Sequence, residues 1–484
     1  MQFHLFFLLC IFIIQSVAIS CFTGSVLWVG IPLSISLGVL SYRNPEYGLK
    51  SLFCLLVLSG LLSNLLSSKP IISITILVLI GWLIGYQAYL RKNKLAVILH
   101  PLYKVFLVLI VGALISEIFS FWQYIGEIPN WTKEVVILYE GRRVNLAHAY
   151  GWIVLGFVIW SSGCFFTLYL YDFIRRFNNQ SKLISWMSIS LVGAIIIGII
   201  QKYFNLHFVN QTLFINEFRI NATFSDPNAL AYFLIIAIPL LIAYWLSCKK
   251  NRFSELKILL IFALIFLMIQ SGTRSALVCL VFMVLVMFLK KRKELIEKFK
   301  EKRKAGLFIF ALFILVLSFT DNTGLKRIAE TFYSENQREG FSYSFLYKDR
   351  LPYWKVGAYI FKENPLSGTG IGRYLLVLPD VLRKGRFYLH TPNEGACNLY
   401  IQIAAEMGIF VFLIMVWILI KTAIKAVKNI KSKEFYTFVV SMLFIFMLLL
   451  FNIGNQIVNL EVSLLFWYLV AVIWAQNAEN QKGT

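Results

Sequence analysis

The sequence predicts an all-α integral membrane protein with about 12–14 transmembrane helices and a long, partly helical periplasmic or extracellular loop before the third-last span. Three observations support this fold class. Of 484 residues, 59% are hydrophobic and only 14% are charged, whereas about a quarter of a soluble protein is charged. Apolar runs of roughly 17–25 residues, each long enough to cross a bilayer, recur along the chain. Between two of them lies one long polar stretch, about 321–396.

The apolar runs divide the chain into three predicted segments: N-terminal transmembrane helices at 1–203, a core at 204–420 that includes the outer loop 321–396, and C-terminal transmembrane helices at 421–484. Residues 3–21 are expected to be a span rather than a signal peptide, because they have no basic start and no clear small-x-small cleavage site. The predicted spans lie at about 3–21, 24–41, 50–66, 71–90, 101–121, 148–171, 184–203, 228–247, 256–270, 275–289, 305–319, 397–420, 435–451 and 460–476.

The formal net charge of +22 is distributed in a way that predicts topology. Lys and Arg concentrate in alternate connections, and residues 290–304 alone hold nine basic and three acidic side chains. Short basic loops stay in the cytoplasm. This rule places both termini inside, and places residues 122–147, 204–227, 271–274 and 321–396 outside. We therefore expect the basic loops to contact anionic membrane lipids, and we expect no nucleic acid partner.

Arg219 is the first of three arginines at the predicted outer boundary. It precedes a span that begins near Pro227, and proline is favourable at a helix start because its missing N–H would be unpaired there anyway. Asp226 or Ser225 can cap that helix. An ordinary helix start explains these three residues but does not explain Arg219.

Arg274 and Arg350 are the other two. Arg274 follows Gly272 in a tight turn between apolar spans, and Arg350 opens an Arg-Leu-Pro-Tyr-Trp motif in the long polar stretch. The turn needs glycine but not arginine. An arginine near the membrane edge is costly and tends to be functional, with snorkelling to headgroups as the alternative. Because guanidinium groups bind phosphates in bidentate fashion, arginines at the outer boundary suit a lipid-linked phosphate.

The long polar stretch also contains a predicted surface helix and a glycine run. Residues 351–362 predict a helix with Trp354, Ala358 and Phe361 on one face. The Gly-Thr-Gly-Ile-Gly run follows at 368–372. No strand–turn–helix context supports a nucleotide loop. The run instead favours a backbone turn that lets another chain or a ligand approach closely.

The cysteines and aspartates argue against a metal site. No two of the seven cysteines form a CxxC pair, so buried free thiols are expected. The five aspartates include no Asp-x-Asp pair, the arrangement that would hold a divalent ion and a nucleotide sugar. We therefore expect no metal and no cofactor.

These motifs together resemble the O-antigen ligase and O-antigen polymerase superfamily of bacterial membrane glycosyltransferases. Their order, and the long outer loop before Asn398, make the resemblance specific. The matching elements, over about residues 215–410, are Arg219…Thr223-Phe224-x-x-Pro227-Asn228-x-x-Ala231, Thr273-Arg274-Ser275-Ala276, Arg350-x-x-x-Trp354, Pro365-x-x-Gly368-x-Gly370-x-Gly372 and Asn398-x-Tyr400-Ile401-Gln402-x-x-x-Glu406-x-Gly408.

The resemblance implies an inverting, metal-independent glycosyltransferase in the inner membrane of a bacterium, with its active site facing the periplasm. The donor would be a glycan on undecaprenyl pyrophosphate, and the acceptor would be a lipid such as lipid A-core or another glycan. Arg219, Arg274 and Arg350 would bind the pyrophosphate, and a histidine in the long loop would assist the acceptor hydroxyl.

One position departs from the family pattern. Many members have a histidine directly before the asparagine that Asn398 matches, and here that residue is Cys397. His390, eight residues before Asn398, can take the same place, and a neutral histidine has the right pKa for a general base. Glu394 is the alternative base, and a third alternative uses no side-chain base. Cys397 as a nucleophile is less favoured.

Asn398 and Glu406 are expected to support the site. Asn398 can cap the span that follows it. Glu406 lies about two turns into that span, where a charge is expensive, so we expect it to pair with an arginine or to accept a hydrogen bond from a substrate hydroxyl. Weaker candidates at the outer boundary are His148 and, in its preceding loop, Arg142 and Arg143.

Three functions compete. A ligase is favoured because Arg274, Arg350 and a loop histidine together resemble the catalytic set of ligases. A polymerase of O-antigen, capsule or exopolysaccharide repeat units has the same fold, and the missing His-Asn pair weakens the ligase interpretation specifically. A lipid-linked oligosaccharide flippase ranks third, because a transporter should show internal repeats and polar groups near the bilayer midplane.

Overall fold

The computed structural model describes most of the chain. The described residues are 2–21, 25–66, 74–123, 134–137, 143–177, 180–210, 215, 218–247, 254–301, 350–389, 395–432 and 434–476. Among them, six helices are long and apolar enough to span a membrane, and five shorter apolar helices accompany them. The predicted all-α integral membrane class is therefore confirmed.

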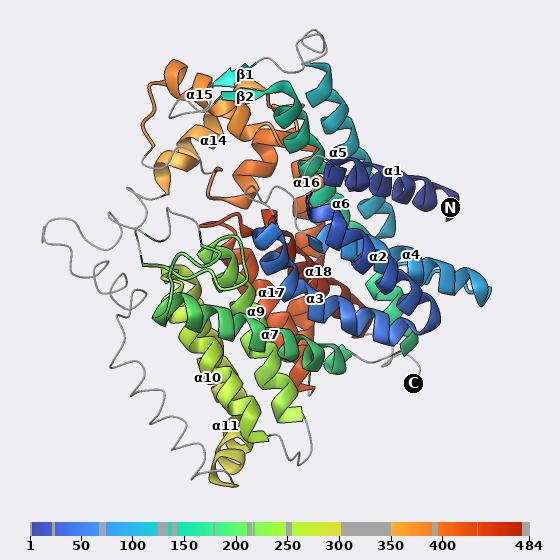
Figure 1. Cartoon of the computed structure of the whole chain (residues 1–484), viewed down its shortest axis with the longest axis vertical. Coiled ribbons are helices and arrows are strands. Elements are labelled where there is room, and N and C mark those ends of the chain that lie inside the picture. Colours follow the sequence, from blue (N-terminus) through green and yellow to red (C-terminus); the bar gives the residue numbers. More distant parts are fainter. Residues whose placement is uncertain are drawn as a thin grey trace, which may run out of the picture.

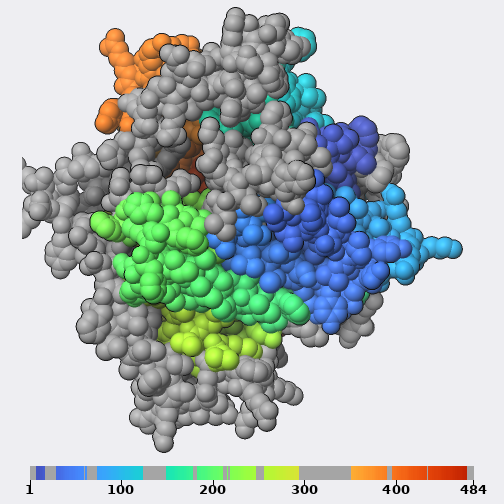
Figure 2. Space-filling view, viewed as in Figure 1, coloured from blue at the N-terminus to red at the C-terminus, as the bar shows by residue number. Residues whose placement is uncertain are grey.

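The N-terminal part is a group of closely packed helices. Small residues let α2 and α4 touch, since a Cβ atom on Gly81 would lie 2.1 Å from the carbonyl oxygen of Ser34. Figure 2 shows the blue surface of these helices beside the green surface that follows in sequence, where α3 packs against α7 (Gln180–Tyr203). The helices are α1 (Gln2–Cys21), α2 (Ser25–Arg43), α3 (Pro45–Leu66), α4 (Ile74–Lys92) and α5 (Tyr103–Trp122).

The remaining helices complete the bundle and its outer layer. The helices α14 and α15 lie together near the top of Figure 1, away from the ends of α10 and α11. Their bounds are α6 (Leu146–Phe177), α9 (Pro227–Ser247), α10 (Ser254–Gln270), α11 (Arg274–Glu301), α14 (Leu351–Glu363), α15 (Tyr374–Gly385), α16 (Leu399–Ile430), α17 (Phe435–Leu450), the short 3-10 helix η4 (Gln456–Val458) and α18 (Leu460–Ala475).

Every predicted span coincides with a described helix except 305–319, which lies outside the described residues. We call the end of the bundle that carries α14 and α15 the outer end, following the predicted topology. The opposite end, with the basic connections at 91–94 and 421–433, is the inner end.

A short hairpin departs from the purely helical expectation. Strands β1 (Glu134–Ile137) and β2 (Arg143–Asn145) pair antiparallel, with a bulge between Glu134 and Val136. The β-branched run Val-Val-Ile favours this conformation. The hairpin appears near the top of Figure 1, packs against α6 and directly precedes it.

The C-terminal helix α18 is the centre of the bundle. Every residue of it except Trp474 is buried, and it packs against α6, α16, α17 and α9. The helices α6 and α16 are each 32 residues long and pack against α18. Because of this length, they connect the outer layer to the inner end.

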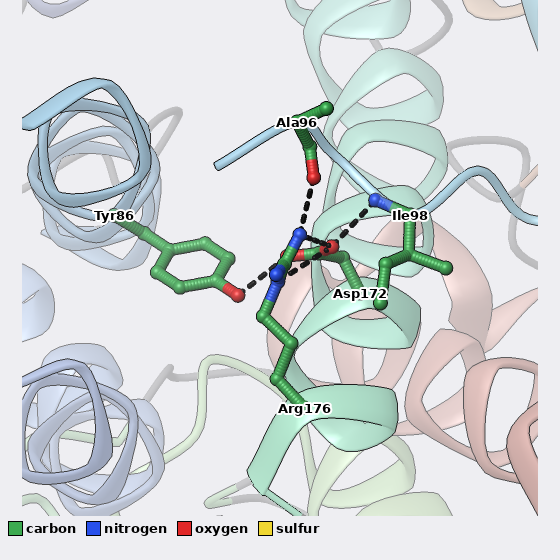
Figure 3. A network of polar contacts seen from close by, with 5 residues as sticks. All are labelled: Tyr86, Ala96, Ile98, Asp172 and Arg176. Carbon is green, nitrogen blue, oxygen red and sulfur yellow. Dashed lines mark hydrogen bonds and ion pairs between the residues drawn. The ribbon is translucent and has the colours of Figure 1, made fainter. Parts of the chain in front are cut away.

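A buried ion pair closes the inner end of α6 (Figure 3). Asp172 accepts hydrogen bonds from the Tyr86 hydroxyl at 2.5 Å and from the backbone N–H of Ile98 at 2.6 Å. Arg176 forms an ion pair with the same carboxylate at 2.9 Å and also donates to the Ala96 carbonyl. A buried charge is stable only when it is paired and hydrogen-bonded, and here α4, α6 and the connection between α4 and α5 share that task.

Candidate active site

Arg219 ties the start of α9 to the turn between α10 and α11. The residue is only 6% exposed. Its Nε donates to the Ser271 carbonyl at 2.7 Å, and its Nη2 donates to Asn228 Oδ1 at 2.8 Å and to Thr273 Oγ1 at 3.3 Å. These protein acceptors give Arg219 a structural task that the sequence did not reveal. Direct binding of pyrophosphate by Arg219 stays a prediction.

The start of α9 follows the predicted pattern. Pro227 is the first helical residue, and Asp226 caps the helix by accepting from the N–H of Asn228 at 2.7 Å. Ser225, the other predicted cap, donates to Asn459 Oδ1 at the start of α18 at 3.4 Å instead. The segment before α9 is thereby joined to the central helix.

The turn before α11 exposes a helix start at the outer end. Gly272 adopts a φ of 70°, a left-handed conformation in which a side chain is costly. Arg274 is the first residue of α11 and is half-buried. The predicted tight turn is therefore present, and the N-terminal end of a helix dipole, which favours anions, lies at Arg274.

Tyr232 brings the segments of the candidate arginines together. Its buried hydroxyl is hydrogen-bonded to Ser275, the neighbour of Arg274, and donates to the Leu450 carbonyl at 3.4 Å. The charge of Arg350 acts on the same hydroxyl, as does the Cys397 thiol. Tyr232 of α9 is thus in direct contact with α11, and Arg350 and Cys397, which precede α14 and α16, lie near enough to act on its hydroxyl electrostatically.

The predicted surface helix is present as α14, but it buries a different face. Tyr353, Val356 and Ile360 point inward, whereas Ala358 is exposed. The helix is only partly polar, and its inward face follows the spacing of three and four residues expected of an amphipathic helix. Arg350 stands directly before it, at the N-cap position.

A second hydrophobic core, the outer cluster, lies beneath α14. It joins α14, α15 and the residues just before α16 to one another and to Ala405 within α16. Its members are Tyr353, Val356, Ile360, Tyr374, Leu378, Leu382, Leu389, Ala396, Cys397 and Ala405.

The glycine-rich turn (residues 368–372) docks onto the ends of three helices. A Cβ atom would lie 2.4 Å from the backbone of Glu406 in α16 at Gly368, 2.0 Å from Ser120 Oγ in α5 at Gly370, and 2.3 Å from the Trp152 carbonyl in α6 at Gly372. All three glycines have positive φ. The close approach predicted from the sequence is real, and the partner is the chain itself.

Glu406 holds this turn from inside α16. Its carboxylate accepts from the backbone N–H of Tyr374 at 3.3 Å and from that of Gly372, and it contacts the side chain of Gln402. The carbonyl of Glu406 accepts from the N–H of Gly370 at 2.8 Å. Among the described residues its partners are therefore backbone amides and a glutamine, where the sequence analysis expected an arginine or a substrate hydroxyl.

A kink in α16 makes room for the turn. Gly408 has φ 74° and ψ 179°, which interrupts the helix, and a Cβ atom there would lie 2.0 Å from the Leu366 carbonyl. The N–H of Ile409 donates to the Pro365 carbonyl at 2.9 Å in place of a bond inside the helix. The carbonyls and amides freed by the kink thus bind the incoming segment.

Asn398 caps α16, as predicted. Its Oδ1 accepts from the N–H of Ile401 at 3.1 Å, and its Nδ2 donates to the Asn452 carbonyl at 3.0 Å. Cys397 adopts a left-handed φ of 50° and is buried in the outer cluster. The position of the usual family histidine is therefore enclosed between Tyr232 and Tyr374, whose hydroxyls both interact electrostatically with the thiol.

Some predicted site residues lie outside the described residues. These are His390 and Glu394, while Arg142 and the side chains of Arg143 and His148 are not described either. Their roles stay predictions. The flanks of the first pair are described: Leu389 belongs to the outer cluster, and Gly395 lies against Asn455 and Gln402.

Three aromatic residues of the site were missed by the sequence analysis or given no role. Tyr232 and Tyr374 were not singled out from the sequence, and Trp354 was assigned only to a motif and to one face of a predicted helix. Among the described residues, the Tyr374 hydroxyl and the Trp354 Nε1 are buried without a hydrogen-bond acceptor or donor. Burial raises the pKa of Tyr374, so this hydroxyl stays protonated at neutral pH. Only the fold brings these groups to one place.

Gly368→Ala is expected to destabilise the protein. The new Cβ atom would combine a disfavoured positive φ with a clash against the Glu406 backbone, costing about 1–3 kcal/mol. Thermal unfolding of the purified protein, followed by its tryptophan fluorescence, measures the loss. Gly151→Ala is the matched control, because a Cβ atom at Gly151 in α6 meets nothing within 4 Å. Equal melting temperatures for the two variants would contradict the docking role of the turn.

One comparison with known families covers the region that holds this site. A family model described as O-antigen ligase matches residues 258–416, which include Arg274, Arg350, the glycine-rich turn and Glu406. No curated protein matches the chain in sequence. The matched region begins in α10 and ends in α16, so it covers the outer cluster and the turn before α11. Over this region the chain, a polytopic membrane protein, is similar to the O-antigen ligase family.

Proposed function

We propose that the chain is a membrane glycosyltransferase that transfers a glycan from undecaprenyl pyrophosphate to an acceptor hydroxyl at the outer face of the inner membrane of a bacterium. The observation that carries the proposal is that Tyr232 is hydrogen-bonded to Ser275, the neighbour of Arg274, and also lies within the electrostatic reach of Arg350. Both arginines belong to the region matched by the O-antigen ligase family model. A lipid-linked donor suits this place, because its head would lie in water and its tail in the bilayer.

Arg274 and Arg350 are the proposed ligands of the pyrophosphate. Each guanidinium can bind two phosphate oxygens, and Arg274 adds the dipole of the start of α11. Arg219 acts with them as a positioning residue, because its bonds to Ser271 and Thr273 shape the turn that presents Arg274. Direct contact of Arg219 with the pyrophosphate is the alternative role.

The reaction that follows is a direct displacement at the anomeric carbon. The acceptor oxygen forms a bond to that carbon while the bond from carbon to the phosphate oxygen breaks. Undecaprenyl pyrophosphate leaves with the electron pair, its charge stabilised by the arginines, and the configuration inverts. The hydroxyl proton passes to a base. No metal is needed, because the arginines supply the positive charge.

His390 is the proposed base. The residue before it, Leu389, packs in the outer cluster with Cys397 and residues of α14. Glu394 is the alternative base. Cys397 is disfavoured as a nucleophile, because its thiol is buried and its backbone leads directly into the cap of α16.

Arg274→Gln and Arg350→Gln are each expected to lower the rate of transfer about 100-fold or more, because each removes charge stabilisation of the leaving group. The measurement is the initial rate with purified protein in nanodiscs, a lipid-linked glycan donor and an acceptor. Arg383→Gln is the matched control, since that side chain is 80% exposed and pairs with Asp380 on α15. Full activity of either test variant, in protein that folds normally, would exclude the pyrophosphate clamp.

His390→Ala is expected to reduce the same rate by about 100-fold or more, the usual contribution of a general base. Glu394→Gln should leave it within a few-fold of the starting value. Unchanged activity of the histidine variant removes the base assignment, and loss only in the glutamate variant transfers the role to Glu394.

A repeat-unit polymerase is the second candidate, favoured by one observation: Cys397 stands where ligases have histidine. The glycolipids of a strain that lacks the protein distinguish the two. Loss of a ligase leaves polymer on the lipid carrier, as we expect. Loss of a polymerase leaves lipid A-core capped with a single repeat unit, a result that would overturn the ligase assignment. A flippase ranks third, since the polar groups gather at the outer end.

A further inference from the structure

Two consecutive arginines at the inner end of α6 have different surroundings. Arg176 is neutralised by Asp172 in the network of Figure 3. Arg175 projects from a different side of the helix, because successive residues are rotated by about 100°. It donates from Nη1 to the Ala475 carbonyl at 3.4 Å. Its Nε is buried and has no acceptor among the described residues.

Lys425 of α16 adds a second positive charge beside Arg175. Its Nζ donates to the Trp474 carbonyl at 3.4 Å and lies 4.5 Å from the centre of the Trp474 ring. The charged groups that act on it are Arg175 and Lys428, both positive. In the part of the chain that the structure describes, no carboxylate pairs with Arg175 or Lys425.

His100 adds a buried hydrogen-bond donor. The residue is 1% exposed and is enclosed by the rings of Phe106, Tyr171 and Trp474. Burial and the charge of Lys425 lower its pKa to about 3, so the ring is neutral. Its Nδ1 accepts from the N–H of Leu102 at 3.0 Å, and the single ring proton must therefore be on Nε2. No described residue accepts a hydrogen bond from this Nε2.

Helix capping explains only part of this arrangement. The last carbonyls of α18 accept one long hydrogen bond each from Lys425 and Arg175, and a helix C-terminus carries about half a negative charge. Two full positive charges face that partial charge. The buried Nε of Arg175 and Nε2 of His100 are left without acceptors, and an unmet buried donor is unfavourable.

We propose that Arg175, Lys425 and His100 form a phosphate-binding site at the inner end of the bundle. A phosphate group supplies what the three residues lack: negative charge, and several acceptor oxygens for a guanidinium, an ammonium and an imidazole N–H. The Nε and an Nη of Arg175 bind two oxygens side by side. The site is distinct from the candidate active site, which lies at the other end of α6 and α16.

Two kinds of ligand could supply the phosphate group, an anionic lipid headgroup and free inorganic phosphate. Basic pockets between transmembrane helices on the cytoplasmic side bind the headgroups of anionic lipids. Free phosphate in the cytoplasm would present the same oxygens without acyl chains. The first source would couple the central helix α18 to the lipid composition of the membrane, because the contacts of Arg175 and Lys425 are with its last residues.

The test is the melting temperature of the full-length protein, purified in detergent and stripped of bound lipid. Sodium phosphate replaces sodium chloride at constant ionic strength in one arm. Phosphatidylglycerol replaces phosphatidylcholine in the other. A rise in either arm supports the site, and its concentration dependence gives an apparent affinity. A rise with phosphatidylglycerol alone identifies a lipid headgroup, and a rise with inorganic phosphate identifies the free anion.

Lys425→Gln and Arg175→Gln are expected to weaken that affinity about tenfold or more, through loss of a charge-assisted hydrogen bond. Lys421→Gln is the matched control, one turn earlier on α16, where the side chain is exposed and lies over the ring of Trp417. The rise with ligand is compared within each variant, so a change in starting stability does not affect the result.

His100→Phe separates a site from a packing defect. Phenylalanine removes the Nε2–H donor and also the Nδ1 acceptor of the Leu102 N–H, so the starting melting temperature is not the readout. With a packing defect alone, the substitution leaves the rise on adding ligand unchanged. With a phosphate site, it reduces that rise. No rise for the unsubstituted protein in either arm, or an equal rise in all variants, would overturn the proposal.

Discussion

The outer half of this protein depends on one contact, the docking of the glycine-rich turn into the kink of α16. Glu406 accepts from the amides of Gly372 and Tyr374, while its own carbonyl accepts from Gly370. A buried carboxylate at this depth is costly unless hydrogen bonds satisfy it, and the backbone of the turn supplies them. The contact fixes the start of α15, and through the outer cluster it fixes α14 and the residues before α16. Arg350, a proposed ligand of the pyrophosphate, directly precedes α14 in that assembly.

Positively charged side chains have different partners at the two ends of the bundle. At the outer end, Arg219 donates hydrogen bonds to the Ser271 carbonyl and to Asn228 Oδ1. The first of these bonds holds the turn that precedes Arg274. At the inner end, Arg176 has its own carboxylate whereas Arg175 and Lys425 share only the end of a helix. An arginine with a complete set of protein partners positions other residues. Arginine and lysine side chains that lack a carboxylate are the ones for which an anionic ligand is inferred.

The features carried by local sequence were predicted well, and those made by tertiary contact were not. Apolar length placed the spans, Pro227 and Asn398 marked helix starts, and Gly272 marked a turn, because each depends on its own neighbours. Glu406 accepts from Tyr374, 32 residues away, and Arg219 donates to Ser271 and Thr273, 52 and 54 residues away, so spacing could not reveal these contacts. The same holds for Tyr232, which is hydrogen-bonded to Ser275 and comes within the electrostatic reach of Arg350 only in the folded chain. The sequence placed Trp354, Ala358 and Phe361 on one face of α14 but did not say which face is inward, and Tyr353, Val356 and Ile360 are the residues that the fold buries.

The central claim is that Arg274 and Arg350 together bind the pyrophosphate of a lipid carrier at the outer boundary of the membrane. The most direct measurement is a cryo-electron microscopy structure of the protein in nanodiscs containing undecaprenyl pyrophosphate. The account predicts phosphate oxygens within about 3 Å of both guanidinium groups, beside Tyr232 and beneath the start of α14. A pyrophosphate bound elsewhere, in contact with neither arginine, would contradict it.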